Sequence, residues 1–343
     1  MDLSKRKHNI IVYHENKLQL WDTDTKKPLV TYDFTAYTFN MGQLQNNVIK
    51  SNNEIIMYAL NVSNEIYIYD IFSGRLINKI QGASDFNICD THMAIWYYSK
   101  KTIEITDLNT MKTASFRDDA DYVIDLVELC VNSKYVAGIE PRYKRIKIID
   151  HTAKHPVMCN DIHYINGPHA TDKLIMNKTH LFCMSKYVDR YKIDIVPLNT
   201  KKFKHGIYVD GLCGRFHLNP INDTVYVTTW LSVAVIKVIT LDPELINTTS
   251  VVLNTSNIAI GSAIAYIQTN LENTADTTTY TRDLNIQCGN KILVKPWDEI
   301  QHKNTYDKSF NIVKVVLDYR LYFTERLKKY IVPDLVDIIM SYC

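Results

Sequence analysis

A β-rich pattern that recurs seven times constrains the fold of these 343 residues more than any other feature. Each copy is a run of alternating apolar and polar residues. The runs end at positions that we call anchors: Asp22, Asp70, Asp107, Asp150, Pro197, Thr240 and Pro296. Successive anchors are 48, 37, 43, 47, 43 and 56 residues apart. A period of two predicts strands, because a helix needs a period near 3.6. The chain is therefore expected to repeat one β-structured unit.

Each repeat is expected to hold four strands, because three further β-rich runs accompany most anchor runs. One precedes the anchor run across a short turn, one lies before a turn signal further upstream, and one follows the anchor. The turn signal stands 17 residues before four anchors, at Asn53, Asp90, Ser133 and Asp223. Short four-stranded sheets bury both faces only when neighbours stack on them. We therefore expect an all-β fold, a seven-bladed β-propeller of four-stranded antiparallel blades over residues 1–319. A pair of β-sandwiches and an irregular solenoid are the alternatives.

The spacing and strand pattern of residues 1–318 resemble the WD-repeat family. The family's Trp-Asp dipeptide stands in register at Trp21-Asp22, whereas Trp297-Asp298 lies one residue past the equivalent position. The Gly-His pair that usually opens a repeat does not occur, and three of the seven anchors are not Asp. The resemblance therefore implies a degenerate WD-repeat-like propeller that depends on apolar packing, without the family's Asp-His-Ser-Trp hydrogen-bond network.

The first repeat has no room for its innermost strand, because its turn falls near Ser4. Residues 311–319 follow the last repeat and are rich in β-branched residues. We expect this segment to supply the missing strand, since such an exchange closes the ring and removes exposed sheet edges.

Residues 320–343 differ from the repeats, and their apolar spacing predicts a tail of two short helices. Pro333 suits the first turn of the second helix. One apolar face of that helix comprises Leu335, Ile338, Ile339 and Tyr342. Helices this short need a surface to pack on. That surface is either the rim of the propeller or a second protein.

Residues 332–342 resemble the Leu-Pro-x-Glu-Leu-x-x-x-Ile core of F-box helices, including the truncated, PRANC-like versions at the C-termini of poxvirus proteins. They depart from this core at Val332 and at the missing Glu. The resemblance implies that the apolar face docks on the adaptor of a cullin-type ubiquitin ligase, while the attached repeats capture a substrate.

Composition narrows the partners and the compartment. Lys and Arg total 39 against 37 Asp and Glu, so the broad basic field needed for sequence-independent nucleic-acid binding is missing. No signal peptide and no run of 18 uncharged apolar residues is readable, so we expect no nucleic acid and no membrane partner. Seven scattered Cys without a Cys-x-x-Cys pair indicate reduced thiols and a cytoplasmic protein.

Abundant Asn, Ile, Lys and Tyr is typical of AT-rich coding DNA, as in a large DNA virus or an AT-rich protist. A viral protein would work in the host cytoplasm or the virion.

Few residues are candidates for metal binding or catalysis. His151, His155, Cys159 and His163 carry metal-capable atoms at intervals of four. Pro156 interrupts any helix there, and an extended segment spreads the four too widely for a tetrahedral zinc site. Phosphate-binding Gly loops, a nucleophile elbow and His-Glu-x-x-His do not occur in the sequence. We expect no metal, no cofactor and no catalysis; the remaining alternative is a propeller enzyme with its site in the central channel.

Hairpin tips carry our candidate contact residues. Arg142, Tyr143 and Arg145 lie at one expected tip and Trp230 at another, and aromatic residues and Arg are common interface anchors. The Thr-rich residues 269–282 are expected to be an insertion, either a loop or a finger for a partner. We expect a non-catalytic protein–protein interaction scaffold. A ubiquitin-ligase substrate adaptor and a structural component of a virus particle are the alternatives.

Overall fold

The regular structure of the protein is entirely β in the residues that a computed structural model describes. These are residues 7–14, 17–32, 49–52, 54–60, 65–117, 126–140, 145–153, 157–163, 171–186, 190–199, 205–210, 214–219, 224–230, 234–241, 246–253, 258–260, 263–273, 278–288, 291–296 and 311–317. Their 28 strands form seven four-stranded antiparallel sheets, so the all-β expectation is confirmed for these ranges. None of the same residues belongs to a helix long and apolar enough to cross a membrane. The predicted tail helices of residues 320–343 lie outside the described residues.

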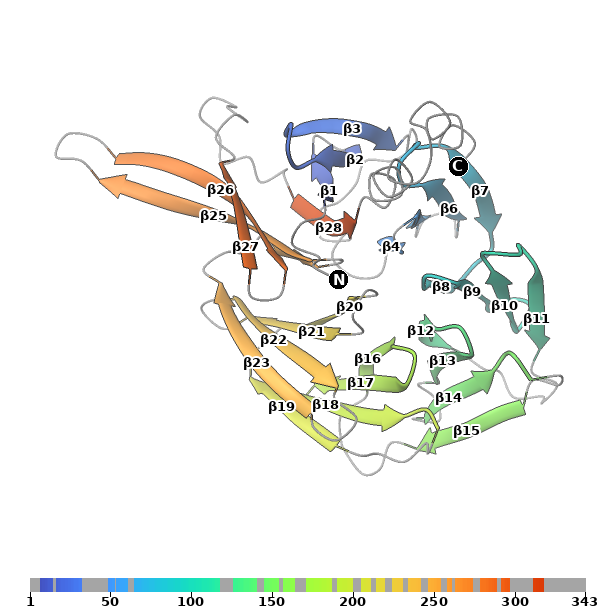
Figure 1. Ribbon diagram of the computed structural model, residues 1–343. Helices are drawn as coiled ribbons and strands as arrows, with labels where there is room; N and C mark the ends of the chain where they lie inside the picture. The colour runs from blue at the N-terminus through green and yellow to red at the C-terminus, as the bar shows by residue number, and fades with distance from the viewer. Residues whose placement is uncertain are drawn as a thin grey trace, which may run out of the picture. The chain divides into compact units, whose positions relative to one another are not determined.

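The chain divides into two compact units. Unit 1 comprises residues 1–38, 71–74 and 255–343, and unit 2 comprises residues 39–70 and 75–254. We number the sheets along the chain, so that sheets 1 and 7 belong to unit 1 and sheets 2 to 6 belong to unit 2 (Figure 1).

Unit 1 contains two sheets, ordered β28-β1-β2-β3 (sheet 1) and β24-β25-β26-β27 (sheet 7). The strands are β1 (His8–His14), β2 (Lys17–Asp22), β3 (Lys27–Tyr32), β24 (Ile258–Ile260), β25 (Ile264–Asn273), β26 (Thr278–Cys288), β27 (Lys291–Pro296) and β28 (Asn311–Leu317). In sheet 1, β28 pairs antiparallel with β1 and places Lys314 opposite Ile11. This is the pairing that the sequence predicts for residues 311–319. A buried cluster that includes Ile10 and Val315 of sheet 1 and Leu284 of sheet 7 forms the core of this unit.

Unit 2 contains five sheets, each of which follows the chain order without a crossover. Sheet 2 has β4 (Ile49–Ser51), β5 (Ile55–Leu60), β6 (Glu65–Asp70) and β7 (Leu76–Gln81); sheet 3 has β8 (Asp85–Ile88), β9 (His92–Tyr97), β10 (Thr102–Asp107) and β11 (Thr113–Arg117). Sheet 4 has β12 (Val127–Val131), β13 (Tyr135–Glu140), β14 (Arg145–Asp150) and β15 (Val157–His163). Sheet 5 has β16 (Thr171–Met176), β17 (His180–Lys186), β18 (Arg190–Pro197) and β19 (His205–Asp210); sheet 6 has β20 (Gly214–Asn219), β21 (Thr224–Trp230), β22 (Ala234–Leu241) and β23 (Ile246–Leu253).

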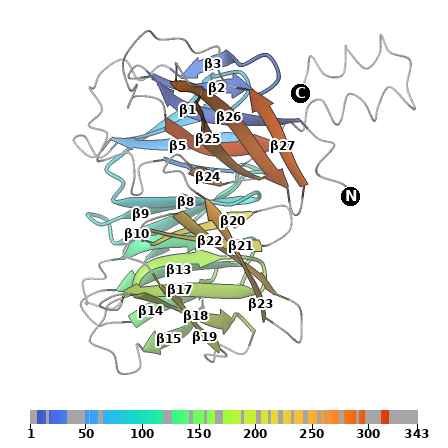
Figure 2. The ribbon, with the colours of Figure 1, turned by 90° about the vertical axis from the view of Figure 1, so that its left-hand side faces the viewer.

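The middle strands of unit 2 are buried on both faces because neighbouring sheets stack on each other (Figure 2). On β9, Met93 and Ile95 contact a cluster shared with sheet 2, whereas Ala94 and Trp96 belong to a cluster shared with sheet 4. Successive side chains of a strand point to opposite faces. This is why single strands such as β9 are apolar at consecutive positions, and why one sheet alone would leave much apolar surface in water.

Side-chain hydrogen bonds join the first strands of neighbouring sheets in unit 2. The bonds run from Asn52 Nδ2 to the Cys89 carbonyl (3.1 Å), from the Leu129 amide to Asp85 Oδ2 (2.7 Å), from Asn87 Nδ2 to the Leu129 carbonyl (2.7 Å), and from Asn132 Nδ2 to the Asn177 carbonyl (2.7 Å). Sheets 2 to 5 are thereby connected in sequence along one row of strands.

The structure corrects the sequence interpretation of the seventh repeat. In sheets 1 to 6 the anchor run is the third strand, but the run that ends at Pro296 is the fourth strand, β27, and the third strand is β26. Residues 269–282 are not a simple loop, because 269–273 continue β25 and 278–282 begin β26. A period of two identifies a strand but does not tell the third strand of a sheet from the fourth.

Candidate functional site

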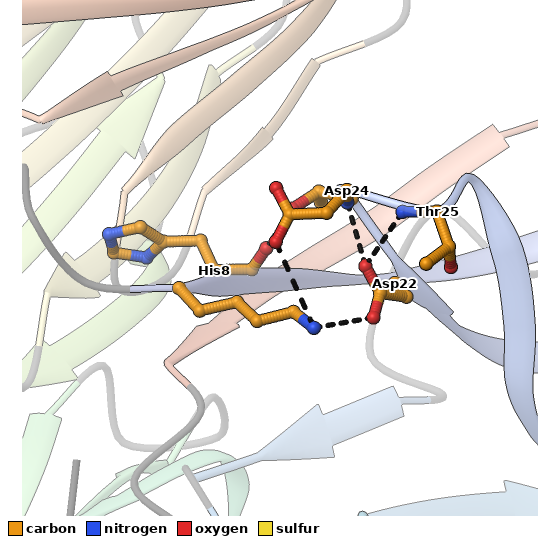
Figure 3. A network of polar contacts seen from close by, with 6 residues as sticks. His8, Asp22, Asp24 and Thr25 are labelled. Carbon is orange, nitrogen blue, oxygen red and sulfur yellow. Dashed lines mark hydrogen bonds and ion pairs between the residues drawn. The ribbon is translucent and has the colours of Figure 1, made fainter. Parts of the chain in front are cut away.

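The turns between the third and fourth strands are held by the anchor carboxylates. At Asp22, Oδ1 accepts hydrogen bonds from the amides of Asp24 (2.7 Å) and Thr25 (3.0 Å), while Oδ2 accepts one from Lys7 (Figure 3). Burial raises the pKa of Asp22, but the bonds from Lys7, Thr25 and Asp24 outweigh it and hold the pKa below its usual value. Asp107 accepts equivalent bonds from the amides of Asn109 and Thr110. These anchors stabilise turns.

The turns between the first and second strands use asparagine in the same way. Oδ1 of Asn132 accepts hydrogen bonds from the amides of Lys134 (2.8 Å) and Tyr135 (2.6 Å), and Asn52 and Asn177 form matching turns. Asn52 and Asn132 also bond across to the next sheet, so these turns lie at one end of unit 2. Because the strands alternate in direction, the hairpin tips between second and third strands lie at the other end. We call that end the hairpin end.

Arg145 is the one candidate contact residue whose side chain is described. It begins β14 opposite Glu140, and its guanidinium donates to the Glu140 carboxylate, which is completely buried. Lys147 Nζ lies 3.8 Å from the same carboxylate oxygen. The Arg145 side chain is 20% exposed. It therefore fixes the base of its hairpin and offers only a small surface of its own.

Of the other candidate contact residues, only Trp230 lies in a described strand. Trp230 is the last residue of β21 and pairs with Ala234 of β22, next to a hairpin tip as expected. The remaining candidates lie outside the described residues: Arg142, Tyr143, Pro333, Leu335, Ile338, Ile339 and Tyr342.

The fully described hairpin tip, between β9 and β10, exposes an aromatic and a cation. Tyr98 is 49% exposed, and Lys100 Nζ lies 4.5 Å from the centre of the Tyr97 ring. The tip is closed by a bond from the Lys101 amide to the Tyr98 carbonyl (3.2 Å), with Lys101 at a positive φ of 52°. Sequence reasoning did not single out Tyr98, although an aromatic beside a polar turn is the same signal that selected Tyr143.

Sheet 5 repeats this combination beside its own hairpin tip. Arg190 begins β18, and its guanidinium carbon lies 4.6 Å from the centre of the Tyr208 ring of β19. Tyr208 is 46% exposed. Cation–π contacts of this kind hold exposed cations over rings at little cost in solvation, so two hairpins present preordered aromatic and cationic groups.

A histidine pair links sheets 3 and 4 at the end opposite the hairpin end. The rings of His92 and His151 lie 4.8 Å apart, and His151 Nε2 is 3.0 Å from the Asn132 carbonyl. Burial lowers the pKa of His92, and the neighbouring His151 lowers it further. Of the other members of the predicted histidine-cysteine series, Cys159 and His163 lie on β15, and His155 is outside the described residues. Within the described ranges no three His, Cys, Asp or Glu residues are arranged to hold a metal ion.

Comparison with known proteins identifies the fold. No protein-family model and no curated protein matches the chain. KlAtg21, in a complex with the coiled-coil of AgAtg16, is 16% identical over 74% of this chain and 79% of its own, with a TM-score of 0.52. A chain of the Mitotic Checkpoint Complex is 11% identical over 75% and 81%, with a TM-score of 0.50. The similar structures include WD40 propeller proteins. The likeness is to the β-propeller fold.

The propeller likeness does not by itself separate functions. A candidate 6-phosphogluconolactonase from Bacteroides uniformis is 14% identical over 91% of this chain and 99% of its own, with a TM-score of 0.52. Sequence identities this low show the fold alone.

Proposed function

We propose that this protein is a non-catalytic scaffold, built on a WD-repeat-like β-propeller, that binds a protein partner at its hairpin end. The observation that carries the proposal is the β9–β10 tip, where Tyr98 is 49% exposed and Lys100 is held over Tyr97. Tyrosine and cationic side chains on a rigid support are typical of interface anchors, because little side-chain entropy is lost on binding. Similar propellers occur in structures of complexes with other proteins.

We propose that the seven sheets are the seven blades of one ring over residues 1–319, and that β28 completes the first blade. Two observations support this arrangement. Each sheet is a four-stranded meander except sheet 1, whose first strand comes from residues 311–317. Neighbouring sheets in unit 2 share buried clusters, and bonds join the first strands of sheets 2 to 5, as in blades around an axis.

The interaction is tested by affinity capture and mass spectrometry with single-site variants. We expect Tyr98→Ala and Lys100→Ala to weaken binding of the captured partner, with a loss of about 30-fold if Tyr98 is worth about 2 kcal/mol. Met111→Ala is the matched control, because Met111 is 64% exposed but lies in the β10–β11 turn at the opposite end of the same sheet. Equal capture by all three variants and the wild type would contradict binding at the hairpin end.

The sequence of the tail favours a second candidate function, that of a ubiquitin-ligase substrate adaptor. In this proposal Pro333, Leu335, Ile338, Ile339 and Tyr342 dock on the ligase adaptor while the propeller holds the substrate. Purified adaptor should bind the wild type and not the Ile338→Asp variant. Binding that is unchanged in this variant disposes of the adaptor function and leaves the scaffold proposal intact.

The proposed place of action is the cytoplasm, of the host if the gene is viral. Free thiols support it, since Cys89, Cys130 and Cys183 form no disulfide with one another or with any other described residue.

A further inference from the structure

Sheet 7 carries a two-stranded ribbon that is longer than the rest of the sheet. β25 and β26 pair continuously from Ile264 opposite Gln287 to Asn273 opposite Thr278. β24 pairs only with residues 264–266 of β25, and β27 pairs only with residues 283–288 of β26. Figure 1 shows the two strands running past β27. Among the described strands, residues 278–282 therefore have a ladder partner on one side only.

Among the described strands, the unpaired edge of β26 at residues 278–282 carries no Lys and no Pro, and Arg282 is its one charged residue. Proteins protect exposed edges with charged side chains, above all Lys, and with Pro, bulges or shortness. The neighbouring edge strand β27 ends in Lys295-Pro296, and β3 begins with Lys27-Pro28. Residues 278–282 read Thr-Thr-Tyr-Thr-Arg, in which the first four have high strand propensity and none is Pro, Lys or Gly. An edge of this kind is a template for another strand.

We infer that the free edge of β26 pairs with the same edge of a second copy of this chain. An antiparallel pair centred on Tyr280 places the two Tyr280 residues opposite each other, Thr279 opposite the second copy's Thr281, and Thr278 opposite its Arg282. Aromatic–aromatic and Thr–Thr pairs are among the favourable cross-strand pairs, and no like charges face each other. The palindromic register uses all five free residues, and its two-fold axis closes the assembly as a dimer.

The free edge of β25 is a poorer match for itself. A two-fold pair centred on Asn270 would place Ile267 opposite Asn273 and Leu271 opposite Thr269, each an apolar residue against a polar one. Cross-strand complementarity therefore selects β26 over β25. The inference concerns self-association and stands independently of the proposed scaffold function.

Sedimentation velocity of the full chain over a concentration series tests the inference by charge exchange at one position. The wild type should show a monomer–dimer equilibrium. Tyr280→Lys places two ammonium groups opposite each other and should weaken dimerisation by about tenfold or more. Tyr280→Glu should do the same alone, whereas an equimolar mixture of the two variants should dimerise again, because opposite charges then face each other.

Asn270→Lys is the matched control, since it adds the same charge to the other strand of the same ribbon and should dimerise like the wild type. A wild type that stays monomeric over the whole series overturns the inference. So does dimerisation that is insensitive to Tyr280→Lys, or that the mixture fails to restore.

Discussion

Replacing Asn132 by Ala tests whether the bonds between neighbouring sheets stabilise the protein beyond the turns that they start from. The Asn132 side chain is buried and makes three hydrogen bonds, two with the amides of its own turn and one to the Asn177 carbonyl in the next sheet. A hydrogen bond contributes about 1 kcal/mol net, and a buried group left without its partner costs about 1–3 kcal/mol. The expected loss in the free energy of unfolding is about 3–4 kcal/mol.

The matched control is Asp107→Ala. Asp107 makes the same two turn bonds, to the amides of Asn109 and Thr110, and has no bond to the next sheet among those seen in the described residues. Replacing Asp107 should lower the free energy of unfolding by about 1–2 kcal/mol, because the two exposed amides can form hydrogen bonds with water instead. Urea unfolding followed by tyrosine and tryptophan fluorescence measures both variants. The reasoning is refuted if the two losses agree within error, because the bond between sheets would then contribute nothing.

Three further predictions follow from strain, protonation and burial. Gly74→Ala should destabilise the protein by about 3 kcal/mol, because φ is +68° and a Cβ would overlap Val30, whereas Gly82→Ala, with φ of +74° and open space, should cost about 1 kcal/mol in the same urea titration. The pKa of His92 is lowered in the folded protein, so the unfolded chain binds more protons below about pH 6.5. The free energy of unfolding should therefore fall from pH 7 toward pH 5, and less steeply in the His92→Gln variant. The same dependence of the free energy of unfolding on pH in both proteins would contradict this. Burial raises the pKa of the Cys183 thiol, so a thiol reagent should modify it only on unfolding, and rapid modification of the native protein would count against its burial.

Strand positions were largely predictable from the sequence because period-two alternation reports directly on burial. Six anchor runs are third strands, and the β-branched segment 311–317 pairs with β1. The prediction for the seventh repeat was wrong because the run that ends at Pro296 is also β-rich and was taken for the third strand, although residues 283–288 of the true third strand alternate between polar and apolar. Alternation shows that a strand is half-buried, and its place in the sheet depends on pairing that sequence does not display.

The polar contacts between sheets were mostly not predictable. Asn52 rather than Asn53 holds its turn, and Asn177 holds a turn in the fifth repeat, for which the sequence analysis identified no turn signal. His92 and His151 lie far apart in sequence and meet because sheets 3 and 4 are neighbours. Such contacts depend on the stacking of whole sheets. Tyr98, in contrast, could have been selected from the sequence, since it stands beside the polar pair Ser99-Lys100 that separates two β-rich runs.

Amide hydrogen exchange of the captured complex against the free protein tests the central claim most directly. Binding at the hairpin end predicts slower exchange in the segments 97–102, 140–145 and 186–190. It also predicts unchanged exchange in the opposite turns, at 108–112 and 151–153. Protection confined to those opposite turns, or no protection at any hairpin tip, would contradict a scaffold that binds its partner through the hairpin end.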